Sequence, residues 1–265
     1  MKRELVFLGA GGAFAHQDQY QSNCVIKTND GLMLLDCGSD IRFSLTEKYP
    51  HINNGNILDY IKWVYISHLH GDHCYGLEWL GFCTYFSQHK DFPLNLISDE
   101  SITEQLWNNV LSGTMEDIVD KKMSLKDYFK VFNPVNNMFQ LGCYEDPIKF
   151  TTVESPHVFP NKKSYGLFIE TYKQKTYFTS DVNKNNYEIN KKYYHDADVI
   201  FQDCETYPYK SGVHYHYEDL LNLPKDIKKK MWLYHHNVTK DKTTNYKLLK
   251  NGFNGFCMKG NSFEI

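Results

Sequence analysis

Residues 63–73 read WVYISHLHGDH and place four potential metal ligands directly after an apolar run. The apolar run at 63–67 has the composition of a strand that is buried on both faces. The six residues after it contain three histidines and one aspartate, namely His68, His70, Asp72 and His73. In a chain of this composition the pattern His-x-His-x-Asp-His has a chance expectation of roughly 0.002. We therefore interpret residues 68–73 as a metal-binding loop.

These four side chains are spaced too tightly for one tetrahedral site, which predicts that two adjacent metals share them. Imidazole and carboxylate groups suit zinc, with manganese or iron as alternatives. Two divalent cations and two carboxylates would leave a net positive centre that attracts an anion. A centre of this kind activates water at neutral pH and stabilises charge on a phosphodiester. Hydrolysis is therefore the expected chemistry.

The rest of the chain predicts an α/β domain in which strands are first paired locally and then alternate with helices. Expected strands are 4–8, 24–27, 32–35, 63–67, 94–97, 149–153, 165–171, 175–179, 199–202 and 231–234, and expected helices are 39–49, 102–111, 125–132 and 217–223. Residues 112–147 have the weakest pattern and are predicted to form an insertion on the rim. With 265 residues, of which 42% are hydrophobic, one domain spanning 1–265 is expected.

Composition restricts the possible partners and the compartment. The net charge of −3 gives no overall field for long nucleic acids. Seven cysteines without a Cys-x-x-Cys motif predict reduced thiols in a cytoplasm. The sequence contains no apolar run of about 18 residues, so no membrane-spanning helix is expected. The first residues imitate a secretory signal, but Glu4 and the glycines from Gly9 to Gly12 favour a strand that ends in a turn.

The order of potential ligands along the chain resembles the metallo-β-lactamase fold, a single-domain αββα sandwich. In that fold the His-x-His-x-Asp-His loop is followed by a histidine, an aspartate and a last histidine, each at the end of a strand. The resemblance covers nearly the whole chain. It implies one metal on His68, His70 and His157, a second metal on Asp72, His73 and His235, and a bridging carboxylate from Asp181. His236 is the competing candidate for the last position, and Asp36 matches a position that hydrogen-bonds near the metal loop.

Two segments near the C-terminus are similar to the ribonuclease Z branch of this fold: DCET at 203–206 and SGVHYHYEDL at 211–220. In that branch a glutamate orients a histidine that protonates the leaving oxygen, and the resemblance gives these roles to Glu205 and His214. A carboxylate partner favours the protonated imidazole that a general acid needs. His216 is the alternative acid, because Tyr215 departs from the small hydroxyl residue of the branch. A polar helix start without catalytic function is the structural alternative.

The same segments, with WLYH at 232–235, resemble metal-dependent cyclic nucleotide phosphodiesterases of the phage anti-Pycsar group. The resemblance implies hydrolysis of 3′,5′-cyclic mononucleotides, including cyclic CMP and cyclic UMP, to 5′-monophosphates by a homodimer with two Zn²⁺ per subunit. In a phage-encoded protein this activity would counteract antiphage signalling in the host cytoplasm. Tyr215 and Tyr217 flank the proposed acid and would offer faces for base-tolerant stacking, unless they pack in the core.

Two other functions are open. A ribonuclease Z-like endonuclease that processes the 3′ end of tRNA would need a basic, glycine-rich arm between the metal loop and the third ligand. The interval between His73 and His157 contains no such arm, so the electrostatic grip on a polynucleotide is missing. A sponge that binds a nucleotide without cutting it would not need a complete ligand set together with Glu205 and His214. The phosphodiesterase acting on small cyclic nucleotides is therefore the preferred hypothesis.

Overall fold

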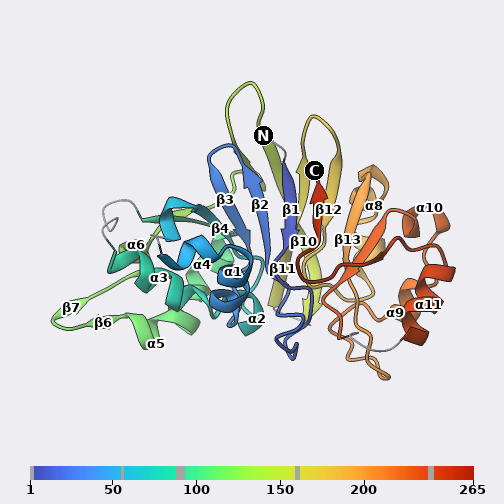
Figure 1. Ribbon diagram of the computed structural model, residues 1–265, viewed down its shortest axis with the longest axis horizontal. Helices are drawn as coiled ribbons and strands as arrows, with labels where there is room; N and C mark the ends of the chain where they lie inside the picture. Colours follow the sequence, from blue (N-terminus) through green and yellow to red (C-terminus); the bar gives the residue numbers. More distant parts are fainter. Residues whose placement is uncertain (1–2, 55–56, 88–92, 159–161, 238–241) are drawn as a thin grey trace.

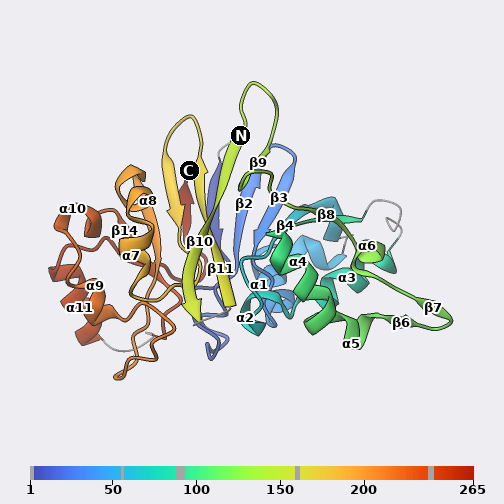
Figure 2. The ribbon, with the colours of Figure 1, turned by 180° about the vertical axis from the view of Figure 1, so that it is seen from behind.

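The computed structural model describes residues 3–54, 57–87, 93–158, 162–237 and 242–265. Within these ranges two seven-stranded sheets pack against each other, and helices lie on the outer side of each sheet (Figure 1). The sequence prediction of an αββα sandwich is confirmed. Figure 2 shows the same layers from behind, with the helices of the first half of the chain on one flank and those of the second half on the other.

The first sheet has the strand order β16-β1-β2-β3-β4-β5-β8. Strands from β16 to β3 pair antiparallel, and strands from β3 to β8 pair parallel. Leu5 pairs with Phe263, so strands from the two ends of the chain lie side by side. The bounds are β1 (Glu4–Phe7), β2 (Cys24–Thr28), β3 (Gly31–Leu35), β4 (Ile61–Tyr65), β5 (Leu94–Ile97), β8 (Phe129–Phe132) and β16 (Ser262–Glu264).

The second sheet repeats this plan with the order β15-β14-β13-β12-β11-β10-β9. Strands from β9 to β12 pair antiparallel, and strands from β12 to β15 pair parallel. The carboxyl ends of β12, β13 and β14 therefore meet at one edge, where ligand sites of α/β sheets commonly form. The bounds are β9 (Met138–Leu141), β10 (Ile148–Val158), β11 (Lys162–Glu170), β12 (Lys175–Phe178), β13 (Val199–Asp203), β14 (Met231–Tyr234) and β15 (Gly255–Phe256).

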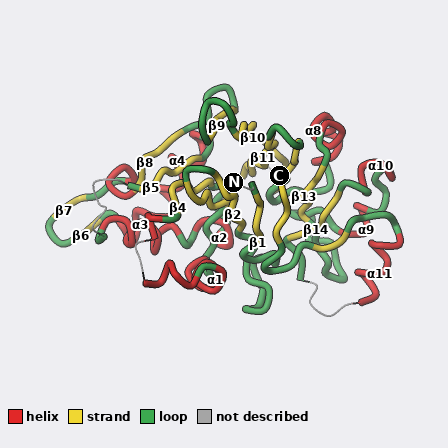
Figure 3. The backbone as a smooth tube through the Cα atoms, turned by 45° about the horizontal axis from the view of Figure 1, so that its top comes forward, coloured by secondary structure: helices red, strands yellow, loops and turns green. Residues whose placement is uncertain are grey.

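The helices are short and gather at the two flanks of the sandwich (Figure 3). Those of the first half are α1 (Ile41–Lys48), η1 (Pro50–Asn54), η2 (Ile57–Asp59), α2 (Gly71–Cys74), α3 (Leu77–Tyr85), α4 (Glu100–Leu106), the π-helical η3 (Trp107–Leu111), α5 (Ser112–Met115) and α6 (Leu125–Tyr128). Those of the second half are α7 (Asn186–Ile189), α8 (Lys191–Asp196), α9 (Tyr217–Leu220), α10 (Lys225–Lys228) and α11 (Lys242–Lys250). None of the helices in the described ranges has the length and apolar character that a bilayer span requires.

Aromatic side chains from both sheets fill the space between them. The ring of Phe7 on β1 lies 5.4 Å from that of Phe201 on β13 and 5.7 Å from that of Tyr234 on β14, measured between centroids. All three side chains are buried, and large rings dominate the energetics of such a core. The Tyr65 hydroxyl at the end of β4 donates to the Tyr165 carbonyl on β11 at 2.9 Å. These contacts hold the ligand-bearing ends of the two sheets in fixed relation.

One helix prediction is wrong in its second half. Residues 125–132 were expected to be helical, but α6 ends at Tyr128 and Phe129–Phe132 form β8 at the edge of the first sheet. The neighbouring strand β5 supplies hydrogen-bond partners that the local pattern does not reveal. Residues 112–147 also contain β9, at the edge of the second sheet, and a hairpin of β6 (Asp117–Ile118) and β7 (Lys121–Lys122). Figure 1 shows this hairpin projecting from one end of the molecule.

Candidate metal centre

The loop after β4 contributes two of its four candidate ligands to one ligand group and two to another. Ile66 extends the strand by donating its N–H to the Ile97 carbonyl, and His68 and His70 follow in extended backbone. Helix α2 then begins directly after His70 and carries Asp72 and His73 in its single turn. The change from extended backbone to helix explains why two histidines from this loop join one ligand group and the next two residues join another.

The first ligand group consists of three histidines. His70 Nδ1 lies 3.1 Å from His68 Nε2 and 3.1 Å from His157 Nε2. His157 lies near the end of β10, which continues five residues beyond the 149–153 expected from the sequence and so includes His157. Burial lowers the pKa of His157 to about 3, so its ring is neutral and free of a proton on one nitrogen at neutral pH. A neutral imidazole is the form that binds a metal.

The second ligand group consists of Asp72, His73 and His235. His235 Nε2 lies 3.2 Å from Asp72 Oδ2, and His73 Nε2 lies 3.4 Å from the same oxygen. His235 follows β14 directly and has a left-handed backbone with φ of 61°. Gly12 packs against its ring, where an added Cβ would lie only 3.2 Å from Cε1. The glycine turn after β1 therefore lies beside this group.

Asp181 lies between the two groups. Its Oδ2 is 3.5 Å from His68 Nε2 and 3.3 Å from His73 Nε2, and its Oδ1 is 3.5 Å from His235 Nε2. Burial by itself would raise the pKa of Asp181, but positive charge on His235 and His73 outweighs it and places that pKa well below its ordinary value. The seven predicted metal-binding residues are thus brought together as two groups that share one carboxylate.

These residues fit divalent cations. Both carboxylate oxygens of Asp181 and the Nε2 atom of His73 are buried without a hydrogen-bond partner among the described residues. Such orphaned polar atoms are costly unless something else binds them. Within each group the ligand atoms lie within 4.8 Å of one another, and imidazole with carboxylate suits zinc, manganese or iron. The site therefore has the nitrogen and oxygen donor atoms that divalent metals would use.

A buried network holds the loop in place from behind. Asp36 Oδ2 accepts from His73 Nδ1 at 2.8 Å and from the Ser67 hydroxyl at 2.9 Å, while its Oδ1 accepts from the Ser67 N–H at 2.8 Å. Ser67 Oγ also lies 3.0 Å from His68 Nδ1. On the other side His157 Nδ1 donates to the Val213 carbonyl at 2.7 Å. These contacts fix the ring orientations and leave Nε2 of all three histidines for a metal.

His214 lies beside the ligand groups and its partner is Asp203. Its Nδ1 is 3.0 Å from Asp203 Oδ2, and its ring centroid is 4.7 Å from that of His235. Burial opposes protonation, but the Asp203 carboxylate outweighs it and raises the pKa of His214 to about 9. Asp203 was not singled out from the sequence. Its position at the end of β13, parallel to the strands that lead to Asp181 and His235, is the signal that could have identified it.

The expected contact between Glu205 and His214 is therefore wrong. The Glu205 carboxylate accepts from the Ser211 N–H at 3.0 Å instead. The Glu205 backbone N–H donates to the Tyr215 carbonyl, and its carbonyl accepts from the Tyr217 N–H. The physical reason is position: Asp203 ends the strand at the site, whereas Glu205 lies two residues further and braces the 211–217 loop.

The two alternative histidines face away from the metal groups. His216 Nε2 donates to the Tyr207 carbonyl at 2.9 Å, and its Nδ1 accepts from the Glu218 N–H at the start of α9. His236 Nε2 donates to the Cys257 carbonyl at 2.9 Å, and burial lowers the pKa of His236 to about 4. Neither belongs to the clusters of metal-ligating atoms within the described ranges. His214 and His235 are the members of each pair that reach the centre.

The stacking role expected for Tyr215 and Tyr217 is wrong. Tyr215 is 4% exposed and packs in the core of the second half of the chain, and Tyr217 is half-buried against the same core. The Tyr217 ring lies against His216 with 4.5 Å between centroids. Tyr215 therefore packs into the core, whereas the neighbouring His214 lines the site.

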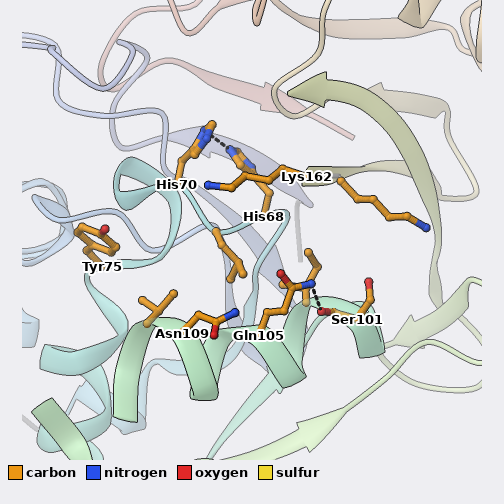
Figure 4. A pocket seen from close by; sticks show the side chains of 11 residues that line it. His68, His70, Tyr75, Ser101, Gln105, Asn109 and Lys162 are labelled. Atoms are coloured by element: carbon orange, nitrogen blue, oxygen red, sulfur yellow. Dashed lines mark hydrogen bonds between the residues drawn. The ribbon is translucent and has the colours of Figure 1, made fainter. Parts of the chain in front are cut away.

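A cavity of about 330 Å³ opens on the side of the first ligand group. Figure 4 shows Lys162 extending toward His70, while Gln105 and Asn109 come from the helix below and Tyr75 from the opposite wall. The positive charge of Lys162 contributes to a lowering of the pKa of His70, whose largest cause is burial. The wall of this cavity therefore combines a cation beside the metal centre with neutral polar groups.

Comparisons with known proteins agree with this geometry. The family model described as "Anti-Pycsar protein Apyc1" matches residues 3–263. A protein of that name from Paenibacillus sp. (strain J14) is 29% identical over 242 residues, covering 89% of this chain and 90% of that protein. A protein of the same name from Bacillus phage vB_BveM-Goe7 is 26% identical over 244 residues, covering 88% of each.

Solved structures share the fold over the full length. The metallo-β-lactamase fold protein YhfI from Bacillus subtilis superposes with a TM-score of 0.72 at 19% identity, covering 99% of both chains. A diphosphatase from the PhnP family has a TM-score of 0.71 at 16% identity, covering 100% of this chain and 98% of that one. The sequence match spans both ligand groups and the His214 segment, and we conclude that this chain belongs to the anti-Pycsar Apyc1 family.

Proposed function

We propose that this chain is a dinuclear metal-dependent phosphodiesterase that hydrolyses 3′,5′-cyclic mononucleotides, including cyclic CMP and cyclic UMP, to 5′-monophosphates. The observation that carries the proposal is the pairing of Asp203 with His214 directly beside the two ligand groups. A bare metal-binding protein has no need of a half-buried, protonated histidine at that position. Membership of the anti-Pycsar family supports the substrate class and a role against cyclic nucleotide signalling in host defence.

The proposed ligand roles follow the two groups. His68, His70 and His157 would hold one cation and Asp72, His73 and His235 the other, with Asp181 as a ligand common to both groups. Zinc matches the donor set, and manganese or iron could bind the same atoms. Two such cations would activate water for attack and neutralise charge on the phosphate oxygens. The role of the chain would be to bind both cations close together, with the Asp181 carboxylate in common, and to place the substrate next to them.

His214 supplies the proton in this scheme. Because Nδ1 is hydrogen-bonded to Asp203, Nε2 is the nitrogen that can deliver a proton. Water gives up one proton to solvent as its oxygen forms a bond to phosphorus, and the bond from phosphorus to the ribose 3′ oxygen breaks. The 3′ oxygen takes the proton from His214, which regains a proton from solvent. The product keeps its 5′ ester and is a 5′-monophosphate. A positioned acid matters here because a ribose alkoxide is a poor leaving group.

The charge distribution favours a small anionic substrate over tRNA. Lys162 is a cation at the cavity beside His70 and suits one phosphate group. In the β6–β7 hairpin, Lys121 pairs with Asp127 at 3.1 Å and Lys122 with Asp117 at 2.9 Å. Paired lysines give this projecting hairpin little net charge for a polynucleotide backbone. The structural likeness to human tRNase Z, with a TM-score of 0.63 at 17% identity, concerns the fold alone.

We infer a homodimer in the host cytoplasm as the working form, on the family relationship and on the occurrence of relatives in Bacillus phages. Light scattering after gel filtration measures the mass of the particle directly. A mass of one chain would contradict the dimer.

Turnover by the purified protein tests the proposed activity. Purified protein is incubated with cyclic AMP, GMP, CMP and UMP and with a precursor tRNA, each with and without a chelator, and products are identified by mass spectrometry. We expect 5′-monophosphates from the cyclic nucleotides and no product with chelator present. Faster cleavage of the precursor tRNA than of every cyclic nucleotide would support the nuclease instead. Binding without turnover would support the sponge.

A further inference from the structure

A second cavity of about 150 Å³ reaches the metal centre at His235, whereas the cavity of Figure 4 reaches it at His68 and His70. We call it the His214-side cavity, because His214 and His235 line it together with Phe14, Tyr207 and Tyr209. Its aromatic members come from two separate loops, the glycine-rich segment after β1 and the segment between β13 and α9. Three rings from two loops thus meet at the edge of the proposed reaction centre.

These rings are accessible, unlike the tyrosines that flank His214. Phe14 is 81% exposed and Tyr209 is 62% exposed, so a large part of each ring lies open to a ligand. The rings of Tyr207 and Tyr209 are stacked, with centroids 5.4 Å apart and an angle of 9° between their planes. His216 anchors the loop by donating to the Tyr207 carbonyl. This hydrogen bond fixes the backbone that carries one ring of the stack.

The direction of the reaction determines which cavity receives the nucleoside. In an in-line displacement the attacking and leaving oxygens lie on opposite sides of phosphorus. A proton donor must lie within hydrogen-bond reach of the leaving oxygen, so the 3′ oxygen lies at His214. In a 3′,5′-cyclic nucleotide this oxygen belongs to the ribose, and the base is attached to the same ring. The base therefore extends toward the His214-side cavity and away from Gln105 and Asn109.

We infer that Tyr209, stacked on Tyr207 in a cavity that Phe14 also lines, forms a stacking site for the nucleobase of the substrate. This inference rests on the proposed function, because it takes the direction of the base from His214 acting on the 3′ oxygen. An aromatic face binds any planar heteroaromatic ring, since every base has a π-face. The site selects a nucleoside over a bare sugar phosphate and tolerates all four bases. Tolerance of different bases was expected from the sequence, but through stacking on Tyr215 and Tyr217. Those two rings pack in or against the core instead.

The test compares substrates with and without a base. The probes are cyclic UMP, cyclic AMP and a base-free 1-deoxyribose 3′,5′-cyclic phosphate, used with wild type, Tyr209→Ala, Tyr209→Phe and Phe14→Ala. We expect wild type to prefer the cyclic nucleotides in kcat/KM by about tenfold or more over the base-free probe. Tyr209→Ala should reduce that preference about tenfold through KM, and Tyr209→Phe should retain it. Tyr172→Ala is the matched control, because Tyr172 is 74% exposed but lies before β12, at the far end from Asp181.

Binding of products keeps the inference testable even without turnover. Calorimetry compares UMP with ribose 5-phosphate on wild type and all four variants, including the Tyr172→Ala control, after metal content and thermal unfolding have been checked. We expect UMP to bind about tenfold more tightly to wild type and the advantage to fall in Tyr209→Ala. An equal loss with Tyr172→Ala, or an unchanged base preference in Tyr209→Ala, overturns the stacking site. Absence of all cyclic nucleotide hydrolysis overturns the proposed function alone, since the binding comparison still decides the stacking site.

Discussion

Asp203 Oδ2 lies 3.0 Å from His214 Nδ1 in a fully buried position at the end of β13. The other oxygen of the same carboxylate lies 3.5 Å from His235 Nδ1. One side chain thus hydrogen-bonds the proposed acid and lies next to a proposed metal ligand, and the two imidazole rings stack against each other. The Val182 N–H also donates to Asp203 at 2.9 Å and ties it to the Asp181 turn. Proton donation and metal binding are therefore joined through a single residue.

We predict that His214→Ala retains its metals and loses about 10²- to 10⁴-fold in kcat on cyclic nucleotides. The loss arises because the 3′ alkoxide then leaves without a proton. Bis-p-nitrophenyl phosphate should be hydrolysed by the variant at a rate much closer to wild type, because p-nitrophenolate needs little protonation. Elemental analysis and steady-state kinetics on both substrates provide the measurements. Equal losses on the two substrates, or missing metal, would give His214 another role.

The pairing with Asp203 predicts a shift in the pH profile. The raised pKa of His214 keeps its imidazole protonated at higher pH, so kcat falls only as the pH rises through that raised value. Asp203→Asn removes the carboxylate charge while its amide oxygen can still accept from Val182. We therefore expect the alkaline fall in kcat to move to lower pH. Glu205→Gln is the matched comparison, because its more remote carboxylate should give a smaller shift. An unshifted alkaline limb in Asp203→Asn would contradict the pairing.

Much of the ligand arrangement could be predicted because it depends on strand ends. His235 and Asp181 follow apolar runs that form β14 and β12, and parallel pairing brings their carboxyl ends to one edge. The choice of His235 over His236 has the same basis, since successive residues at a strand end point in different directions. His236 then lies in the interior against the Cys257 carbonyl.

The features that were missed depend on contacts between distant segments. Asp203 and Glu205 are both acidic and two residues apart, so only the packing of the 211–217 loop decides which carboxylate reaches His214. The Phe129–Phe132 segment becomes a strand because β5 lies beside it. Tyr215 is buried because it packs into the core of the second half of the chain, against residues distant in sequence. None of these outcomes follows from local propensity.

We predict that Asp181→Ala loses both metals rather than one. Asp181 lies within 3.5 Å of histidines of both ligand groups, and removal of its charge leaves each group short of a ligand. Metal per subunit should fall from two toward zero after gel filtration, as measured by elemental analysis, with circular dichroism as the check on folding. Asp30→Ala, in the exposed turn between β2 and β3, is the control and should retain two. Retention of one full equivalent in Asp181→Ala would show that the carboxylate serves a single site.

Two neighbouring lysines distinguish a charge that binds the substrate from charge elsewhere on the surface. Lys162 and Lys163 are neighbours on β11 and both are exposed, but Lys162 extends toward His70 (Figure 4) while Lys163 pairs with Glu154 at 3.0 Å. Lys162→Ala should therefore raise KM for cyclic nucleotides about two- to fivefold with little change in kcat, the size expected for one partly screened charge. The effect should shrink in 0.5 M salt, since salt screens an exposed cation from the phosphate. Lys163→Ala changes the net charge equally and should leave KM near the wild-type value. Equal effects of the two substitutions would mean that the increase in KM reflects overall charge. A loss confined to kcat in Lys162→Ala would mean that the Lys162 ammonium group acts at the reacting atoms and not in binding the anion.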